Sequence, residues 1–482
     1  MKKVLAVAVL LVWGTVTSTS FAFRGGLLGS SGRKARINRR LSLSLSSARN
    51  EVLGHERILE DESSCPLRVG IAGAGAVAFG MASILAKNGH QTLLWSPSGK
   101  GTADLIPKDQ IESKVPPSIT STGAMHHEFV PEIASSAQQL ATESDVLIVA
   151  LPANGHKQIF DALAPHLSAS SPSSSSATAK KKHIIVSSHA SFGALYLSQF
   201  LHELGNHHHT ITSWGTTVCT ARRKSGSTVD IKTIRKSVDT SCVPESDSDS
   251  SLELCSRLFP DIQFRPREGL LAITLSNLNP QNHLAIAMGN ISRMDKGEEW
   301  YQFQNITPRI GGFLEQLDRE RLEIASALGL DVKTVYEHFN LSFHVPIPQS
   351  GSLSEMCQDI YKKGNDVHGP TVADSRYITE DVPFGLAPVV ALGKLVGRPA
   401  ILHESGMAIC NAMYGRDFSA ENDLLEAIDL DGIELSELRE AARTGQLSKP
   451  IFFGGAVTPP QRHGDSSPSK VSASAETAAQ VG

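Results

Sequence analysis

Short apolar runs, separated by amphipathic stretches, occupy the first half of the chain. The runs are LRVGIAG at 67–73, QTLLW at 91–95, DVLIVALP at 145–152 and HIIVSS at 183–188. They are apolar at consecutive positions, as expected of strands that are covered by helices on both faces of a parallel sheet. We therefore predict a parallel α/β domain over residues 66–266.

From about Leu270 the apolar positions recur at helical spacing instead. A capping box, SLSE at Ser352–Glu355, opens one expected helix, and Gly329 can end another. The residues near one face of the latter are Phe313, Leu314, Leu317, Ile324, Ala325 and Leu328. The pattern predicts an all-α C-terminal domain over residues 267–455.

The two ends of the chain and one internal loop do not fit either domain. Residues 4–16 are apolar and follow Lys2 and Lys3, which is typical of a signal peptide, here over residues 1–22. Residues 23–60 begin with a Ser- and Arg-rich stretch that holds no acid before Glu51, and we predict a disordered, transit-like segment. The pair predicts routing through the secretory pathway to a plastid, with simple secretion as the alternative. Low complexity also predicts an inserted loop at 168–182 and a disordered tail at 456–482.

The composition of the chain limits the kinds of partner that the protein is expected to bind. The chain has 482 residues, 40% of them hydrophobic and 20% charged, which suits a two-domain globular protein. Of 45 basic residues, nine lie in the acid-free residues 1–50, so the remainder carries about 36 basic against 49 acidic residues. This excess of acid argues against a nucleic-acid partner. The six cysteines form no CxxC pair, so we expect free thiols and no metal, and nothing indicates a stable membrane anchor or an oligomeric state.

A glycine-rich loop follows the first predicted strand. Gly73, Gly75 and Ala78 form G-x-G-x-x-A before a helix predicted over Met81–Asn88, with the strand 91–95 next. Gly73 permits the tight turn, Gly75 lets a pyrophosphate approach the backbone, and Ala78 lets the helix pack on the strand. The α/β domain is therefore predicted to be a Rossmann-type dinucleotide-binding domain, with a glycine-rich turn that binds nothing as the alternative.

The choice of dinucleotide is left open. An acidic residue that binds the ribose hydroxyls usually ends the second strand of NAD enzymes, but here Trp95 is followed by Ser96-Pro-Ser-Gly-Lys100. Ser96, Ser98 and Lys100 are able to meet a 2′-phosphate. The predicted cofactor is NAD(H) or NADP(H).

Two further segments carry candidate chemistry. NPQNH places Asn279 and His283 at the expected start of the helical domain, and an imidazole exchanges protons near neutral pH. RYITEDVPFGL, from Arg376, sets charged residues directly against an apolar run. By itself Asp381 could cap a helix that begins at Val382, and Asp374 and Glu380 are predicted to be solvated. His207–His209 are read as polar surface rather than metal ligands.

NPQNH, RYITEDVPFGL, LDRERLEIASALGL and WGTTVCTARRKSGSTVDI together resemble the octopine/nopaline-type opine dehydrogenases over about residues 67–432. The resemblance implies NAD(P)H-dependent reductive condensation of a 2-oxo acid with an amino acid, both of them small-molecule substrates. It implies that His283 is the general acid/base and Asp381 its hydrogen-bond partner. Arg376 would hold a substrate carboxylate or the cofactor pyrophosphate, and Asn279 would bind substrate or cofactor. A Leu284 where the family often has Pro leaves the substrate open.

The sequence also allows two other functions. One is a different two-domain reductase, of the ketopantoate reductase or glycerol-3-phosphate dehydrogenase type. Those families rely on a lysine in the helical domain, whereas this chain offers NPQNH and RYITED. The other is a protein that binds the dinucleotide without catalysis, which the presence of both His283 and Asp381 disfavours.

Overall fold

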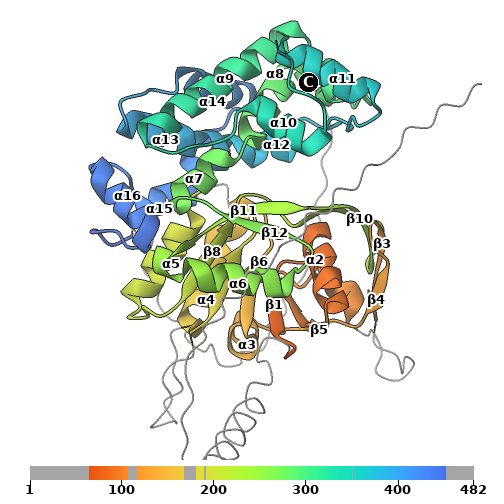
Figure 1. Cartoon of the computed structure of the whole chain (residues 1–482), viewed down its shortest axis with the longest axis vertical. Helices are drawn as coiled ribbons and strands as arrows, with labels where there is room; N and C mark the ends of the chain where they lie inside the picture. Colours follow the sequence, from red (N-terminus) through yellow and green to blue (C-terminus); the bar gives the residue numbers. More distant parts are fainter. Residues whose placement is uncertain (1–64, 107–116, 168–180, 189–190, 350, 452–482) are drawn as a thin grey trace, which may run out of the picture. The chain divides into compact units, whose positions relative to one another are not determined.

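The computed structural model describes residues 65–106, 117–167, 181–188, 191–349 and 351–451 (Figure 1). The predicted signal peptide, transit-like segment and tail, and most of the loop at 168–182, lie outside these residues. Those predictions, and the destination they imply, stay predictions. Within the described residues, no helix combines the length and the apolar composition that crossing a bilayer requires.

Twelve strands are described, in two sheets (Figure 1). The larger sheet has the order β12-β11-β8-β7-β6-β1-β2-β5, parallel except between β8 and β11, and the smaller has the order β4-β3-β10-β9. The strands are β1 (Arg68–Ala72), β2 (Gln91–Trp95), β3 (Ile119–Gly123), β4 (His127–Phe129), β5 (Glu132–Ile133), β6 (Val146–Val149), β7 (His183–Val186), β8 (Thr210–Trp214), β9 (Cys219–Arg223), β10 (Thr228–Ile234), β11 (Ser237–Val243) and β12 (Gln263–Pro266).

Helices alternate with these strands and then continue alone after β12. The α-helices are α2 (Ala76–Lys87), α3 (Ala137–Glu143), α4 (His156–Leu167), α5 (Gly193–Glu203), α6 (Ser248–Leu258), α7 (Gly269–Ser276), α8 (Asn279–Asp295), α9 (Pro308–Ala327), α10 (Val335–Phe343), α11 (Leu353–Lys362), α12 (Arg376–Thr379), α13 (Ala387–Leu395), α14 (Ile401–Tyr414), α15 (Asp423–Ile428) and α16 (Leu435–Thr444). Single turns are η1 (Ala103–Leu105), η2 (Ala153–Gly155), η3 (Glu245–Asp247), η4 (Phe303–Asn305), η5 (Val382–Leu386) and η6 (Ser419–Glu421). The predicted fold class, a Rossmann-type domain followed by an all-α domain, is confirmed.

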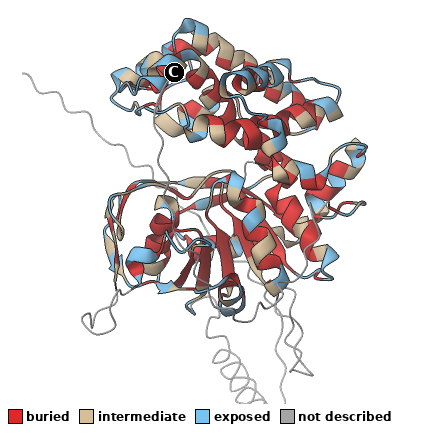
Figure 2. Ribbon diagram, turned by 180° about the vertical axis from the view of Figure 1, so that it is seen from behind, coloured by how far each residue is buried: buried red, intermediate tan, exposed pale blue. Residues whose placement is uncertain are grey.

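The central strands are buried on both faces, as the consecutive apolar positions predict (Figure 2). In β6, Val146 and Ile148 join a core with α2 and α6, whereas Leu147 and Val149 join a core with α4 and α5. This alternation arises because neighbouring side chains of a strand point to opposite faces. The four apolar runs at 67–73, 91–95, 145–152 and 183–188 therefore all became strands of one sheet, β1, β2, β6 and β7.

Local signals in the sequence set several helix ends. Ser352 Oγ accepts a hydrogen bond from the Glu355 amide, and the Glu355 carboxylate accepts one from the Ser352 amide, so the predicted capping box is present. The helix after the glycine-rich loop begins at Ala76, earlier than the predicted Met81. Most residues of AVAFG are small, so this first part of the helix can pack close to the sheet. A prediction from the apolar positions that begin at Met81 misses this part of the helix.

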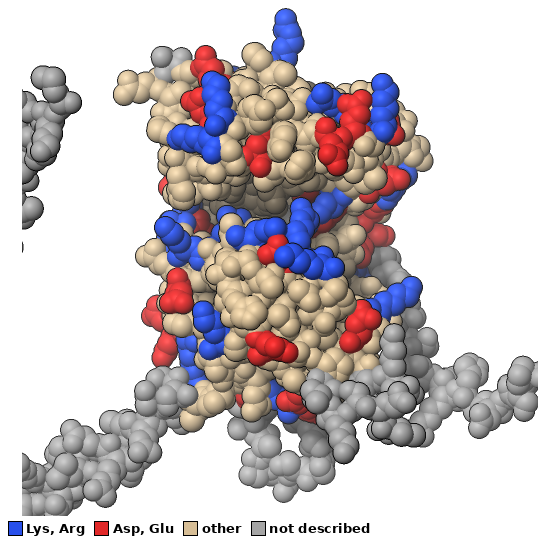
Figure 3. Space-filling model, turned by 90° about the vertical axis from the view of Figure 1, so that its right-hand side faces the viewer, with Lys and Arg blue, Asp and Glu red and all other residues tan. Residues whose placement is uncertain are grey.

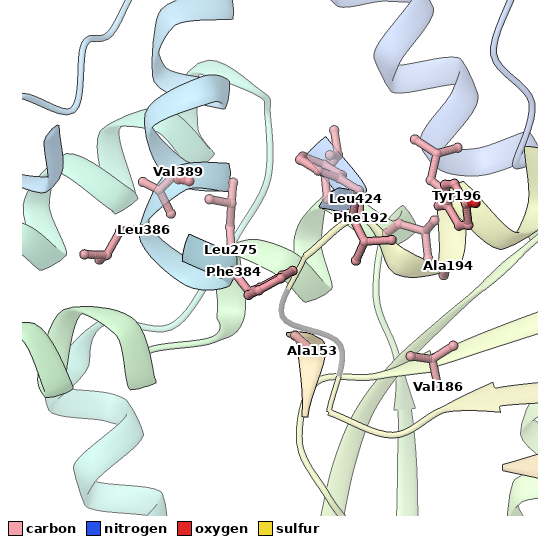
Figure 4. Close-up of a cluster of buried hydrophobic side chains, with 14 of the residues drawn as sticks. Ala153, Val186, Phe192, Ala194, Tyr196, Leu275, Phe384, Leu386, Val389 and Leu424 are labelled. Atoms are coloured by element: carbon pink, nitrogen blue, oxygen red, sulfur yellow. The ribbon is translucent and has the colours of Figure 1, made fainter. Parts of the chain in front are cut away.

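The core on the α4–α5 face continues into the helical domain. Figure 4 shows Ala153, Val186 and Phe192 from the dinucleotide domain in one apolar cluster with Leu275 and Phe384 from the helical domain. Burial of apolar surface is the main stabilising term in folding. This shared core fixes the turn that contains Phe384 against the carboxyl ends of β6 and β7.

Candidate active site

The glycine-rich loop joins β1 to α2 and is held in a tight turn. Gly73 has φ +135°, and its amide donates to the Trp95 carbonyl over 2.9 Å. A Cβ at Gly73 would lie 2.4 Å from the Ala150 oxygen, whereas a Cβ at Gly75 would meet no described atom within 4 Å. Ala78 is fully buried against the sheet. The loop therefore leaves open space at the N-terminus of α2, which suits a pyrophosphate.

Gly73 and Gly75 are predicted to differ sharply on substitution. Gly73→Ala should lower the free energy of unfolding by about 2 kcal/mol or more, because the new Cβ meets backbone in a left-handed conformation. Gly75→Ala should change stability by less than about 1 kcal/mol and weaken NAD(P)H binding about tenfold by filling the phosphate space. Urea unfolding and fluorescence titration with NADH and NADPH measure both effects. Equal stability losses in the two variants would contradict the account.

The turn after β2 folds back onto the glycine-rich loop. Ser96 is half-buried and Lys100 is exposed in this turn, whose Gly101 lies against Ala74. Arg223 in β9 fixes the two segments together, since its Nη1 donates to the carbonyls of Ala74 (3.1 Å) and Gly101 (3.0 Å). The structure thus places Ser96 and Lys100 beside the dinucleotide loop. Arg223 lies in the segment WGTTVCTARRKSGSTVDI, but the sequence alone does not distinguish it from its neighbours there.

His283 and Asp381 form a hydrogen-bonded pair. His283 lies in the second turn of α8, and its Nδ1 is 2.7 Å from Asp381 Oδ2. The side chains are 12% and 7% exposed. Among the described residues, the opposite ring nitrogen, Nε2, has no hydrogen-bond partner. A carboxylate on Nδ1 fixes the tautomer that leaves Nε2 available to exchange a proton with a substrate.

The packing of η5 against α8 brings the pair together. Gly385 lies so close to Pro280 that a Cβ would approach the proline ring to 2.2 Å. The chain makes a π turn here, with the Ala387 amide bonded to the Val382 carbonyl, and Pro388 has no amide hydrogen to continue a regular α-helix. Asp381 caps no helix, because its side chain accepts no backbone hydrogen bond in the first turn. The capping alternative is therefore wrong, and the carboxylate is available to His283.

Tyr377 covers the face of the His283 ring. The two ring centroids are 3.5 Å apart and the planes differ by 8°. The Tyr377 hydroxyl donates to Gln302 Oε1 over 2.8 Å. Burial raises the pKa of Tyr377 to about 12, and the Asp381 charge adds to this rise, so the hydroxyl stays protonated near neutral pH. Stacking holds the imidazole plane and leaves the ring edge open, so that Nδ1 reaches Asp381 and Nε2 is available to a substrate.

We expect the stacking, rather than the hydroxyl, to support turnover. Tyr377→Phe keeps the ring and should retain most of kcat, whereas Tyr377→Leu should lower kcat by up to about tenfold, because a stacked aromatic pair contributes about 0.5–1.5 kcal/mol. Steady-state kinetics of both variants measure this. Equal kcat values for the Phe and Leu variants would show that the stacking has no part in the reaction.

The other charged residues of the segment 374–381 differ in burial, and not all of them as predicted. Arg376 is exposed and pairs through Nε with Glu380 Oε2 at 3.1 Å, and among the described residues no hydrogen bond or ion pair joins it to His283 or Asp381. Asp374 is exposed, as predicted. The prediction that Glu380 is solvated is wrong, since only 8% of it is exposed. Its Oε1 accepts a hydrogen bond from the Ala153 amide at 3.2 Å. A sequence pattern cannot reveal this, because the partner lies 227 positions away.

Asn279 is exposed at the start of α8, one turn before His283 and on the same helix face. The structure places its side chain near that of His283 but records no hydrogen bond from it to a described residue. Its predicted binding role stays a prediction.

The histidines at 207–209 are only partly surface residues. His207 and His208 are exposed, but His209 is buried and bonded to Asn206, so the prediction is wrong for His209. In the part of the chain that the structure describes, no three His, Cys, Asp or Glu side chains are arranged to hold a metal ion. The described cysteines form no disulfide.

Basic side chains gather near the paired residues. Arg222 in β9 is exposed, and its charge, like that of Arg376, opposes the rise in the pKa of Tyr377 that burial causes. Lys224, which directly follows β9, and Lys232 in β10 lie 3.5 and 2.5 Å from Asp230 of β10. Figure 3 shows one side of the molecule, where Lys and Arg side chains line the edge of a hollow. A positive field of this kind suits anionic substrates and phosphates, although the chain as a whole is acidic.

Both the dinucleotide-binding domain and the helical domain resemble known protein families. Residues 266–414 match the family of the NAD/NADP octopine/nopaline dehydrogenase alpha-helical domain. Residues 68–190 match the family described as NADP oxidoreductase, coenzyme F420-dependent. An opine dehydrogenase of Arthrobacter sp. (strain 1C) is 26% identical over 377 residues, which cover 77% of this chain and 97% of that enzyme.

Solved structures show the same fold. An octopine dehydrogenase with NADH and L-arginine aligns with a TM-score of 0.62 and 17% identity, covering 78% of this chain and 98% of that one. A yersinopine dehydrogenase with NADP+ aligns with a TM-score of 0.52 and 13% identity, covering 79% and 98%. The predicted resemblance and the predicted use of a nicotinamide dinucleotide are thereby confirmed. The choice between NAD and NADP stays open.

Proposed function

We propose that this chain is an opine dehydrogenase that joins a 2-oxo acid, such as pyruvate, to the amino group of an amino acid through an imine. The chain is an NAD(P)-dependent oxidoreductase that acts on CH–NH groups. The proposed condensation of a 2-oxo acid with an amino acid rests on one observation. It is the His283–Asp381 pair, close in sequence to Arg376, in a helical domain of the octopine/nopaline type. This pair supplies a proton donor, and Arg376 and Arg222 supply positive charge for carboxylates.

The overall reaction needs one hydride and one proton. The amine adds to the carbonyl carbon of the 2-oxo acid, the carbonyl oxygen leaves as water, and the resulting imine is reduced at carbon to a secondary amine. A bound NADH or NADPH supplies the hydride. The open space at Gly75 and the N-terminus of α2 fit its pyrophosphate.

His283 is the general acid in this scheme. Its Nε2 delivers a proton to the departing oxygen, and the imidazole takes that proton back in the reverse direction. Asp381 holds Nδ1 at 2.7 Å and stabilises the imidazolium. Tyr377 covers one ring face and keeps water from it. The mostly buried pair therefore exchanges its proton through Nε2, which no described residue engages.

Arg376 binds an anion in this proposal. Its side chain is 64% exposed, and its guanidinium is held by Glu380 through Nε. A guanidinium binds carboxylate and phosphate oxygens through two parallel hydrogen bonds. Either the substrate carboxylate or the cofactor pyrophosphate fits this chemistry.

A substrate panel tests the proposal. NAD(P)H oxidation is followed with pyruvate plus each amino acid in turn, with ketopantoate and dihydroxyacetone phosphate as controls. We expect oxidation only when a 2-oxo acid and an amino acid are both present. Oxidation with ketopantoate or the triose phosphate alone would replace the proposal with one of the other two-domain reductases.

A further inference from the structure

Glu380 joins three parts of the site, and the reaction scheme above gives it no role. It follows α12 directly and is 8% exposed. One carboxylate oxygen accepts from the Ala153 amide at 3.2 Å, and the other lies 3.1 Å from Arg376 Nε. The next residue is Asp381, the partner of His283.

The Ala153 contact places Glu380 against the dinucleotide domain. Ala153 begins η2, directly beyond the carboxyl end of β6, which lies next to β1 in the sheet. The Leu151 carbonyl in the same loop is hydrogen-bonded to the buried His156, and this bond holds the loop in position. Ligands of doubly wound sheets bind at the carboxyl ends of the strands. The carboxylate therefore stands where the helical domain meets the cofactor side of the sheet.

Arg376 cannot serve two anions equally well. In the structure Glu380 occupies its Nε, although most of the Arg376 side chain is exposed. An incoming anion gains the full charge of Arg376 only by competing with Glu380. Once Arg376 turns away, a buried carboxylate is left beside Asp381 without its cation, and that arrangement is costly unless the carboxylate takes up a proton.

We propose that Glu380 is a positioning residue that holds Arg376 in the unliganded enzyme and takes up a proton from solvent when Arg376 transfers to a bound anion. The proposal rests on the proposed function for the identity of that anion, a substrate carboxylate or the cofactor pyrophosphate. A protonated Glu380 still accepts from the Ala153 amide through its carbonyl oxygen. The contact between the domains therefore survives while Arg376 changes partner.

The surroundings of Glu380 support this exchange. Burial raises the pKa of Glu380, the Asp381 charge adds to the rise, and the charges of Arg376 and His283, with the Ala153 hydrogen bond, oppose it. Loss of the Arg376 contact removes one opposing charge, so the carboxyl pKa rises further and a proton is bound. The groups that face Glu380 are thus Arg376 from α12, Asp381 from the following turn, His283 from α8 and the loop amide of Ala153.

Isothermal titration calorimetry in buffers of different ionisation enthalpy counts the protons taken up on binding. One arm titrates NADH into the free enzyme, and the other titrates oxalate, an unreactive carboxylate, into the NADH-bound enzyme, both near neutral pH. We expect uptake of up to one proton in one arm. Proton uptake on NADH binding would show that Arg376 binds the cofactor pyrophosphate. Proton uptake on oxalate binding would show that Arg376 binds the substrate carboxylate.

Variants decide whether Glu380 takes that proton. Glu380→Gln keeps an oxygen for the Ala153 amide and should abolish the uptake. It should also bind the same probe about two- to fivefold more tightly, because Arg376 has lost a partly exposed competitor. Glu323→Gln removes a carboxylate that is likewise four residues after an arginine, Arg319, at an exposed site on α9, and should behave as the wild type. Arg376→Gln, at an exposed position, should abolish uptake without altering the packing.

The outcomes separate this proposal from the proposed function. Absence of proton uptake in both arms, or uptake that persists in Glu380→Gln, would overturn the role of Glu380. Neither result bears on whether the enzyme condenses a 2-oxo acid with an amino acid, which the substrate panel decides. Tighter binding without a loss of uptake would also overturn it, because the proton would then belong to another group.

Discussion

His283→Ala is expected to lower kcat by about 10²- to 10⁴-fold, the usual contribution of a general acid or base. The reason is local, since Nε2 is the ring nitrogen without a hydrogen-bond partner among the described residues and Asp381 holds the other at 2.7 Å. The glycine-rich loop joins β1 to α2, whereas His283 lies on α8. NADH affinity should therefore change by less than about twofold. Steady-state kinetics with a cofactor titration separate the two quantities.

A second histidine provides the control. His126 is exposed before β4, and His126→Ala should leave kcat within about twofold of the wild type. Survival of turnover in His283→Ala would mean that another group supplies the proton. A parallel loss of NADH binding would instead indicate that the substitution disturbs the fold.

Asp381→Asn is expected to lower kcat by about 10²-fold or more, because an amide does not stabilise an imidazolium and can bind the wrong tautomer. In the direction of opine oxidation the imidazole must begin neutral. Without the carboxylate the ring holds its proton less tightly, so the acidic limb of the pH–rate profile should move to lower pH. Rate measurements across the pH range in that direction test both effects.

Asp374 offers a matched substitution in the same segment. It is exposed seven positions earlier, and Asp374→Asn should preserve both the rate and the profile. If Asp381→Asn leaves the profile unmoved, the 2.7 Å contact has no catalytic meaning. In that case Asp381 acts only in packing.

The sequence predicts those parts of the fold that local chemistry decides. The runs that became β1, β2, β6 and β7 are apolar at consecutive positions, and such strands require cover on both faces. The capping box at Ser352 needs only residues within one turn. α2 begins at Ala76, earlier than predicted, because Ala76 and Val77 carry no signal that distinguishes a helix from a loop.

The site was predictable only where a motif marks it. His283 and Asp381 belong to two separate motifs, and their contact spans 98 positions in the sequence. Glu380 could not be predicted in this way. Its neighbours in the sequence are polar and predict an exposed side chain, whereas the shared core around Phe384 buries it. Tyr377 had no signal of its own, because a tyrosine beside an arginine is common and the stacking depends on how α12 packs on α8.

The identity of the reduced product tests the central claim most directly. The enzyme is given NADH or NADPH deuterated at the transferred position, together with the 2-oxo acid and amino acid selected by the panel, and the products are analysed by mass spectrometry. The account predicts a secondary amine that contains both carbon skeletons, with one deuterium on the former carbonyl carbon. A deuterated 2-hydroxy acid, with the amino acid recovered unchanged, would contradict it.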